Sequence, residues 1–403
     1  MDAASLTQLL SPQGRALLAE LPPYVAEESL RVSTRLRERG VDAGLVAAAL
    51  TQSRLRERAR AKFGERAGRM FFTVAGLEQA TRQVVAAHHA RRYAGAGSRL
   101  VADLGCGLGG DAIALSGLGV AVLAVEADPV TADLAEANLR EFPTASVRHG
   151  DALALDLAAE GVDAVFADPA RRAGGRRIFD PTAYSPPLDV VLALRARVPA
   201  LGVKVAPGVP YSALPPDARA QWVSVDGDVV EAGLWFGPLA AEGPGRSALV
   251  LAGGAAHVLT EADGAGAAGR PDAPARAGEV RPVGAFLYEP DGAVIRAGLV
   301  ARAAELLGAG LLSEDIAYLT GDTLVATPFA TAYRVLDHFP FGLKPLRAYL
   351  RARDVGVVTI KKRGTAVEPE QLRRQLGLRG TRAATIVLTR IAGRQSVLVV
   401  EPA

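Results

Sequence analysis

The chain has 403 residues, of which 49% are hydrophobic and 22% charged. This composition is typical of a globular protein with two or three domains. The apolar runs are too short to cross a bilayer, and the N-terminus lacks the pattern of a secretory signal, so we expect a cytoplasmic protein without a membrane anchor. The single cysteine, Cys106, excludes an intrachain disulfide and a cysteine-rich zinc site, and no metal is expected.

Residues 1–92 are predicted to form a helical N-terminal domain. Apolar residues recur at three-to-four spacing in the stretches 9–21, 27–39, 43–60 and 77–93, with prolines and glycines between them. Between Arg31 and Arg69, eleven basic residues accompany four acidic ones. Although the net charge is only +3, this segment is either a solvated helix face or a surface that binds a polyanion.

Residues 93–260 alternate short apolar runs with helical stretches, which predicts a parallel sheet wrapped by helices. After residue 220 no helical stretch separates the predicted strands, a pattern that indicates an antiparallel edge. The predicted strands are 100–104, 121–126, 146–149, 164–167, 202–205, 222–225, 229–235 and 247–259, and the predicted helices are 111–118, 130–142 and 187–198.

A linker is predicted at residues 261–280, which are rich in Ala, Gly, Pro and Asp and show no periodicity. Residues 281–403 then mix helical stretches at 294–307, 343–353 and 369–376 with strands at 355–361, 384–390 and 396–400, predicting a small α+β domain. Between Gly342 and Arg394, thirteen basic residues accompany three acidic ones. Phosphate contacts supply much of the affinity for nucleic acids, so Lys361, Lys362 and Arg363 are candidate contacts to RNA.

A glycine-rich turn follows the first predicted strand of the 93–260 segment. Asp103, Gly105, Gly107 and Gly109 alternate with other residues there, and a helix follows. Glycines allow a tight turn and a close approach of backbone to ligand, and Asp103 could accept hydrogen bonds from a cationic amino group. A turn of this kind is also found in nicotinamide-dependent enzymes, so it does not identify the ligand by itself.

Two further carboxylates follow the next two strands. Glu126 ends the second strand about twenty residues beyond the glycine turn, where a carboxylate can accept hydrogen bonds from both hydroxyls of a ribose. Asp151 follows the third strand and could accept a hydrogen bond from an adenine amino group. Taken alone, Gly150-Asp151 is more typical of a surface turn than of a ligand contact.

Asp168 and Pro169 end the fourth strand, and ligands of open α/β sheets lie beyond such carboxyl ends. The four features together resemble the class I methyltransferase core over residues 95–258. This resemblance implies a Rossmann-like, seven-stranded α/β core that binds S-adenosyl-L-methionine. The expected cofactor contacts are Asp103, Gly105, Cys106, Gly107, Gly109, Glu126, Ala127, Asp151 and Ala152.

The Asp168-Pro169 turn is similar to the Asn/Asp-Pro-Pro turn of enzymes that methylate exocyclic nitrogens, although Ala170 and Arg171 replace the second proline and the aromatic residue. Asp-Pro-x-Arg also resembles the turn of uridine C5 methyltransferases. That chemistry needs a cysteine nucleophile, and Cys106 lies within the cofactor turn. Transfer to nitrogen or oxygen remains, with Asp168 and Pro169 as the candidate catalytic residues that position the acceptor.

The segment before the core is locally similar to the trimethylguanosine synthases, whose aromatic-Thr segment folds over the cofactor. The resemblance implies that Phe72 and Thr73 contact the cofactor, whereas a buried apolar contact beside a helix cap is the alternative. Beyond Asp168, four arginines suit a phosphate-bearing substrate, because guanidinium groups pair bidentately with phosphate oxygens. They are Arg171, Arg172, Arg176 and Arg177, and a solvated basic loop is the alternative.

The core and tail together resemble a bacterial group of methyltransferases with a C-terminal THUMP-like domain, and THUMP domains bind RNA in several RNA-modifying enzymes. The resulting hypothesis is a methyltransferase that acts on a base nitrogen of structured RNA, such as tRNA or rRNA. An N- or O-methyltransferase of a small molecule or protein side chain is a second hypothesis. A noncatalytic RNA-binding protein with this fold is a third. The sequence does not indicate the oligomeric state.

Overall fold

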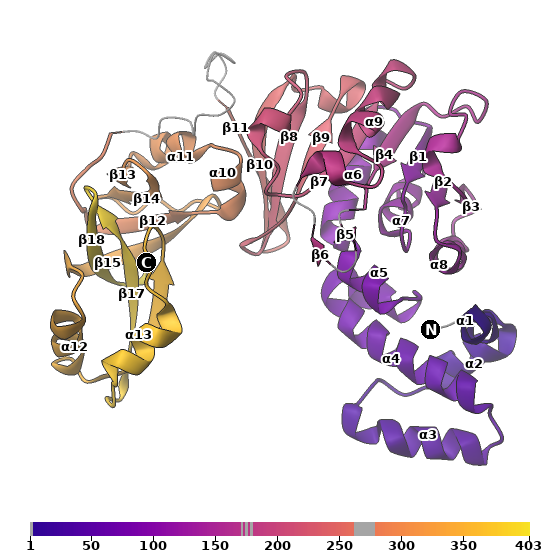
Figure 1. Ribbon diagram of the computed structural model, residues 1–403, viewed down its shortest axis with the longest axis horizontal. Coiled ribbons are helices and arrows are strands. Elements are labelled where there is room, and N and C mark those ends of the chain that lie inside the picture. The colour runs from indigo at the N-terminus through magenta and orange to yellow at the C-terminus, as the bar shows by residue number, and fades with distance from the viewer. Residues whose placement is uncertain (1–2, 171, 174–175, 178–179, 262–278) are drawn as a thin grey trace. The chain divides into compact units, whose positions relative to one another are not determined.

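The computed structural model describes residues 3–170, 172–173, 176–177, 180–261 and 279–403. The chain divides into two compact units (Figure 1). The first comprises Met1–Ala206 with Leu234–Gly243, and the second comprises Pro207–Gly233 with Pro244–Ala403. Most of the predicted linker, residues 262–278, lies outside the described residues. Among the described residues, no helix combines the length and the apolarity needed to cross a bilayer.

The N-terminal part of the first unit is helical, as predicted. Helices α1, α2 and α3 each contact the long helix α4 (Figure 1). Local capping sets their limits: Ser11 and Asp42 accept hydrogen bonds from backbone N–H groups at the starts of α2 and α4, and α4 ends at Gly64, with φ of 53°. The helices are α1 (Ala3–Leu10), α2 (Pro12–Glu20), α3 (Ser29–Glu38), α4 (Ala43–Phe63), α5 (Val74–Gln79) and α6 (Gln83–Gly95).

A nine-stranded sheet has the order β11-β10-β8-β9-β7-β4-β1-β2-β3. Strands β3, β2, β1, β4 and β7 are parallel neighbours, so their carboxyl ends share one edge. The strands are β1 (Leu100–Leu104), β2 (Ala121–Glu126), β3 (Ala145–His149), β4 (Ala164–Ala167), β7 (Leu201–Val205), β8 (Arg219–Val225), β9 (Asp228–Trp235), β10 (Gly245–Ala252) and β11 (Ala255–Thr260).

The Rossmann-like α/β class is confirmed. The described residues form a sheet of nine strands, whereas the apolar pattern predicted eight and the resemblance implied seven. The ninth strand arises in the stretch 247–259, which was treated as a single strand. The chain reverses there at Gly253 and Gly254, with φ of 57° and 80°, and forms the antiparallel pair β10–β11. Two consecutive residues with positive φ are typical of a tight hairpin turn, a signal that the apolar pattern alone does not carry.

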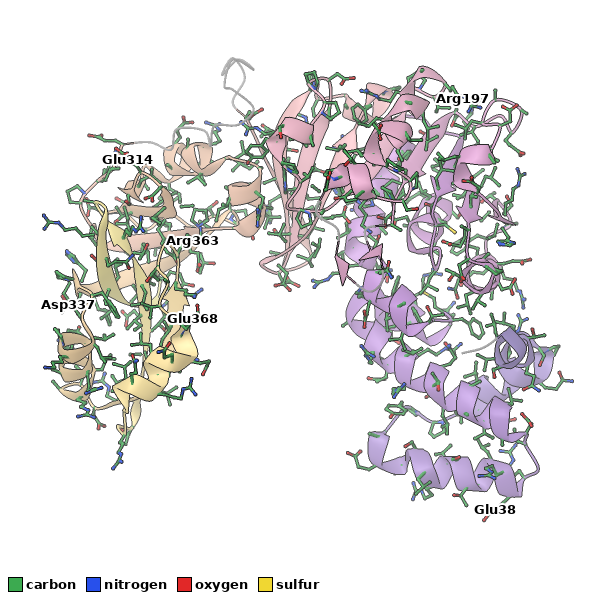
Figure 2. The ribbon with its side chains drawn as sticks, in the orientation of Figure 1. Glu38, Arg197, Glu314, Asp337, Arg363 and Glu368 are labelled. Atoms are coloured by element: carbon green, nitrogen blue, oxygen red, sulfur yellow. The ribbon has the colours of Figure 1, made fainter. Side chains whose placement is uncertain are left out.

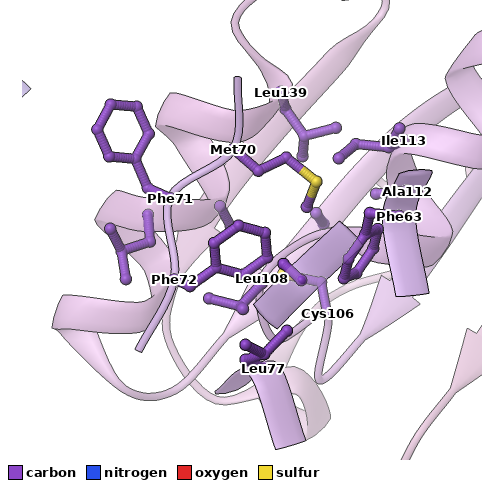
Figure 3. Close-up of a cluster of buried hydrophobic side chains, with 14 of the residues drawn as sticks. Phe63, Met70, Phe71, Phe72, Leu77, Cys106, Leu108, Ala112, Ile113 and Leu139 are labelled. Carbon is purple, nitrogen blue, oxygen red and sulfur yellow. The ribbon is translucent and has the colours of Figure 1, made fainter. Parts of the chain in front are cut away.

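Helices α7 (Gly110–Gly117) and α8 (Pro129–Leu139) pack with α6 in one apolar core with residues of β1, β2 and β4. The helices α4 and α5 contribute Phe63 and Leu77 to the same core (Figure 3). Helix α9 (Leu188–Ala193) follows β4, over part of the range 187–198 that was predicted to be helical. The N-terminal helices and the strands β1, β2 and β4 therefore share one core within the first unit.

The segment 70–73 joins the N-terminal helices to the glycine turn. The Asn138 side chain of α8 accepts a hydrogen bond from Phe71 N (2.7 Å) and donates to the carbonyls of Phe71 (3.1 Å) and Leu108 (3.0 Å). Gln52 of α4 pairs in the same way with both backbone groups of Phe72. Figure 3 shows Phe72 beside Leu108 in the apolar cluster. Two buried amides therefore fix this segment against the turn.

In the second unit, a seven-stranded sheet has the order β13-β14-β12-β15-β18-β17-β16. Leu346, Leu350, Leu372 and Leu376 of α12 and α13 pack on β16–β18. The predicted helix 294–307 is interrupted at Gly298, with φ of 72°. The elements are α10 (Gly292–Arg296), α11 (Val300–Leu307), α12 (Leu343–Arg351), α13 (Pro369–Leu376), β12 (Phe286–Pro290), β13 (Gly310–Ser313), β14 (Ile316–Gly321), β15 (Ala330–Pro340), β16 (Val355–Lys362), β17 (Arg382–Ile391) and β18 (Arg394–Pro402).

Asn138→Ala should lower the free energy of unfolding by about 2–4 kcal/mol, because it leaves three buried backbone groups of Phe71 and Leu108 without their partner. Chemical denaturation followed by circular dichroism measures this change. Glu136→Ala, on the exposed face of the same helix, is the control and should change stability by less than about 0.5 kcal/mol. Equal stability of the two variants would contradict the bridging role of Asn138.

Candidate functional site

The glycine turn lies between the carboxyl ends of β1, β2 and β4. The backbone N–H groups of Gly105 and Cys106 both donate to the carbonyl of Val125, at 2.9 and 3.1 Å. Gly105 has a φ of 82°, and a side chain there would place its Cβ 3.2 Å from the carbonyl oxygen of Asp168. Glycine is therefore required by both conformation and space. At Gly107, with φ of 56°, an added Cβ would meet open space.

Glu126 supports the turn from the end of β2. Its two carboxylate oxygens accept hydrogen bonds from Gly107 N (2.9 Å) and Asp128 N (3.0 Å). Ala127 follows Glu126 and accepts a hydrogen bond from His149 Nε2 through its carbonyl oxygen. Each carboxylate oxygen has two acceptor sites, so Glu126 keeps capacity for further donors.

Asp103 is buried at the end of β1, with an exposed fraction of 1%. Its Oδ2 atom has no hydrogen-bond partner within the described ranges. Burial, followed by the charges of Asp111 and Asp168, raises the pKa of Asp103 well above its usual value. A buried unpaired carboxylate is costly, so this oxygen indicates a place for a cationic ligand.

Cys106 occupies the turn as an inert side chain. Burial, with the charges of Asp103 and Glu126, raises the pKa of the Cys106 thiol well above its usual value. A thiol in this environment stays protonated and is a poor nucleophile. This environment agrees with the exclusion of covalent C5 chemistry.

Asp168 directly follows β4 and lies next to Lys204 of β7. Lys204 Nζ donates to Asp168 Oδ2 at 2.7 Å and to Thr81 Oγ1 at 2.9 Å. Thr81 in turn donates to Asp111 Oδ2 at 2.7 Å, and His89 Nδ1 lies 2.8 Å from Asp111 Oδ1. A line of five polar side chains thus runs from the sheet edge between α6 and α7.

Asp111 is the ionised centre of this line. Burial opposes its ionisation, but the hydrogen bond and charge of His89, with Lys204 and Thr81, outweigh that effect and lower the pKa of Asp111. Sequence reasoning missed Lys204, Thr81, Asp111 and His89. The one available signal was Lys204, a charge inside the apolar strand Leu-Gly-Val-Lys-Val, because lysine is rarely buried unless it is paired.

The side chains of the remaining predicted cofactor residues contact nearby parts of the protein. Asp151 is exposed and accepts a hydrogen bond from Leu153 N, and Ala152 is half-buried in the same turn. Phe72 is fully buried and packs 5.7 Å from Phe63, ring centre to ring centre. Thr73 Oγ1 caps α5 by accepting from Gly76 N. Contact of these residues with a cofactor stays a prediction.

Pro169 is buried, and only parts of the predicted arginine loop that follows it belong to the described residues. Strands β5 (Arg172–Ala173) and β6 (Arg176–Arg177) are antiparallel, and Arg172 pairs with Arg177. Arg171 lies outside the described residues. Ala170 then pairs with Ser185 through two backbone hydrogen bonds.

In the second unit, the predicted phosphate contacts on β16 and just after it are engaged by acidic residues. Lys361 Nζ lies 2.6 Å from Glu289 Oε2, and Arg363 Nη2 lies 3.8 Å from Glu289 Oε1. Lys362 Nζ lies 2.6 Å from Glu368 Oε1. Arg363 and Glu368 are labelled in Figure 2. All three basic side chains are about one-third exposed, at 33%, 32% and 28%.

Three domain families match the chain. A methyltransferase domain matches residues 101–171, a THUMP domain-like family matches residues 330–402, and a domain of unknown function matches residues 2–59. An uncharacterized S-adenosylmethionine-dependent methyltransferase of Mycobacterium tuberculosis is 37% identical over 346 residues, 84% of this chain and 90% of that protein. The chain belongs to the class I S-adenosylmethionine-dependent methyltransferases with a C-terminal THUMP-like domain.

A solved structure supports the same fold. The crystal structure of a candidate methyltransferase from Porphyromonas gingivalis W83 matches with a TM-score of 0.71 at 20% identity. The match covers 95% of this chain and all of that one. The two proteins therefore share their fold along nearly the whole of this chain.

S-adenosylmethionine is the cofactor, and the residues at the sheet edge fit it. The carboxylate charges of Asp111 and Asp168 both act on Asp103, and the ammonium of Lys204 compensates for part of this negative charge. The sulfonium and ammonium groups of the cofactor would add positive charge where it is lacking. Asp103 would hold the ammonium, and Glu126 would hold the ribose. Within the described ranges, no group of three or more His, Cys, Asp or Glu side chains could hold a metal ion.

Glu126→Ala should weaken cofactor binding about 10- to 100-fold, the loss expected for hydrogen bonds to a charged group worth about 1.5–3 kcal/mol. Isothermal titration calorimetry with S-adenosylmethionine measures this change. The control is again Glu136→Ala on α8. Undiminished binding by Glu126→Ala would exclude Glu126 from the cofactor site.

Cofactor affinity should fall as the pH is lowered, because Asp103 with its raised pKa takes up a proton that must leave before a cation can bind. Calorimetry in buffers of different ionisation enthalpy should detect proton release on binding. Asp103→Asn should remove this proton release and weaken binding about tenfold or more. A pH-independent affinity of the unsubstituted protein would contradict the assignment.

Asp103→Asn should also stabilise the cofactor-free protein against unfolding at neutral pH. A raised pKa means that ionised Asp103 is less stable in the folded than in the unfolded chain, so stability is lost as the pH rises above the unfolded-state pKa. Asparagine has no such loss. A gain of roughly 1 kcal/mol would raise the melting temperature by about 2–4 °C.

Proposed function

We propose that this methyltransferase modifies a base nitrogen of structured RNA, such as tRNA or rRNA. The observation that carries the proposal is the position of Asp168. Its carboxylate ends β4, its backbone carbonyl faces Gly105 of the cofactor turn, and a quarter of its side chain is exposed. An acceptor bound at this carboxylate would lie beside the cofactor's reactive end.

Asp168 and Pro169 would position the acceptor. The cofactor supplies an electrophilic methyl group on a sulfonium sulfur. The Asp168 carboxylate would accept a hydrogen bond from the acceptor N–H, which directs the nitrogen lone pair and increases its nucleophilicity. The buried ring of Pro169 fixes the turn that presents this carboxylate. The proton released from nitrogen would pass to Asp168 or to water.

The RNA part of the proposal rests on two observations. The THUMP domain-like match covers residues 330–402, and the thirteen basic residues between Gly342 and Arg394 include exposed ones such as Arg379, Arg382 and Arg394. We propose that Arg171, Arg172, Arg176 and Arg177 also contact phosphate groups, next to the acceptor.

Lys361, Lys362 and Arg363 differ from these arginines, because Glu289 and Glu368 neutralise part of their charge. Their remaining exposure allows a phosphate oxygen to share these cations. In this proposal the C-terminal domain, residues 281–403, binds RNA, the core at 93–260 carries the chemistry, and the helical residues 1–92 support the core.

Purified protein with radiolabelled S-adenosylmethionine should transfer label to RNA extracted from a strain that lacks the gene. RNA from the parent strain is already modified and should accept at least about tenfold less label. Asp168→Asn should reduce incorporation by about 10²-fold or more, the usual range for a lost acid–base group. If label appears only in the protein or small-molecule fraction, RNA is not the acceptor and the labelled fraction contains it. If no fraction becomes labelled, the proposed methyl transfer is contradicted.

A further inference from the structure

Lys204 is a buried cation that the chemistry proposed above does not yet use. Its side chain is 5% exposed, and it lies on β7 next to the carboxyl end of β4. Taking an ammonium out of water costs several kcal/mol unless close partners compensate. A lysine at this position in the apolar strand β7 therefore costs free energy of folding, which suggests that it has a function.

The two carboxylate oxygens of Asp168 differ in their hydrogen bonding, because Lys204 donates to only one of them. Oδ2 accepts from Lys204 Nζ at 2.7 Å on the buried side. Within the described part of the chain, no hydrogen bond is formed by Oδ1, and the Asp168 side chain is 25% exposed. One oxygen is thus anchored, and the other is left for an acceptor.

Thr81 and Asp111 fix Lys204 in turn. A hydroxyl has a single proton, so Thr81, which donates to Asp111 Oδ2, must accept from Lys204. Asp111 is held by His89 through its other oxygen. Thr81 lies just before α6, His89 lies in the middle of α6, and Asp111 lies in the first turn of α7. The position of the ammonium is therefore set by two helices.

We propose that Lys204 is a positioning residue that, through its ion pair with Asp168, orients the methyl acceptor. The nature of the acceptor rests on the function proposed above, whereas the role of Lys204 applies to any N–H or O–H acceptor at Asp168. The other charged groups around this pair are Asp103 on β1, Glu126 on β2, Asp111 on α7, His89 on α6 and Lys62 on α4. Lys204 contacts the Asp168 carboxylate directly, at 2.7 Å.

A purely structural ion pair is the competing explanation. It predicts that loss of Lys204 reduces stability and leaves the protonation of Asp168 and the rate of methyl transfer unchanged. Three variants distinguish the two roles. Lys204→Met removes the charge at similar volume, Lys204→Arg keeps the charge, and Val203→Ala creates a cavity at the neighbouring, fully buried position of β7.

The first measurement needs no acceptor. Carbon-13 NMR of protein labelled at the aspartate carboxyl carbons, with the Asp168 signal assigned through Asp168→Asn, follows the titration of Asp168. In Lys204→Met the midpoint should move to higher pH by about one unit or more, since a carboxylate that loses an adjacent cation binds protons more readily. Lys204→Arg should restore most of the shift, and Val203→Ala should leave the midpoint unchanged.

The second measurement is the rate of methyl transfer to whichever fraction accepts label. In Lys204→Met, kcat at saturating S-adenosylmethionine should fall about 10²-fold and its acidic limb should move to higher pH, and calorimetry gives the Kd for the cofactor separately, so that a loss of rate is distinguished from a change in binding. An unchanged Asp168 midpoint, or a shifted midpoint with unchanged kcat, overturns the role of Lys204. Absence of label in RNA instead overturns the proposed substrate and leaves the NMR result valid.

Discussion

The arrangement of charge at one sheet edge is the constraint on which the site depends. Parallel strands end together, so Asp103, Asp168 and Lys204 come from neighbouring strands and meet in a region closed by α6 and α7. Burial and the charges of Asp111, Asp168 and Glu126 all raise the pKa of Asp103, and the charge of Lys204 lowers it. This excess of negative charge is unfavourable in the cofactor-free protein, and a cationic cofactor bound at Asp103 would relieve it. Affinity for the cofactor and instability of the empty site thus have the same origin.

The same edge explains why the glycine turn has its particular shape. Gly105 lies too close to the Asp168 carbonyl to carry a side chain, and Glu126 fixes Gly107 through its backbone N–H. Asn138 and Gln52 then connect the turn to the segment that contains Phe71 and Phe72. Groups that would face the cofactor are therefore held by groups that do not, which limits their freedom before any ligand binds.

Much of the core was predictable because each element has a strong local signal. Strands β1 and β2 have the predicted bounds, since an apolar run ends at a carboxylate or a glycine. The break at Gly298 was missed because a single glycine inside an apolar pattern does not show whether its φ is positive. The reversal at Gly253 and Gly254 was also missed, although a Gly-Gly pair between two apolar runs is a hairpin signal that the sequence contains.

The site divides in the same way. Asp103, Glu126 and Asp168 belong to local patterns and could be located from the sequence, whereas the partners of Asp168 could not. Thr81, His89, Asp111 and Lys204 are far apart in the chain, and only the packing of α6 and α7 on the sheet brings them together. Neutralisation of Lys361 by Glu289, 72 residues away, was hidden for the same reason.

The amide bridge at Asn138 has a consequence for shortened forms of the protein. A fragment that begins at residue 93 would keep every strand of the nine-stranded sheet but would lose Gln52, Phe63, Phe71 and Phe72. Its glycine turn would then border on water along Leu108 and Leu139, and the fragment should tend to aggregate through that apolar surface. The N-terminal helices thus form part of the apolar core beside the glycine turn and are not a separate domain attached to it.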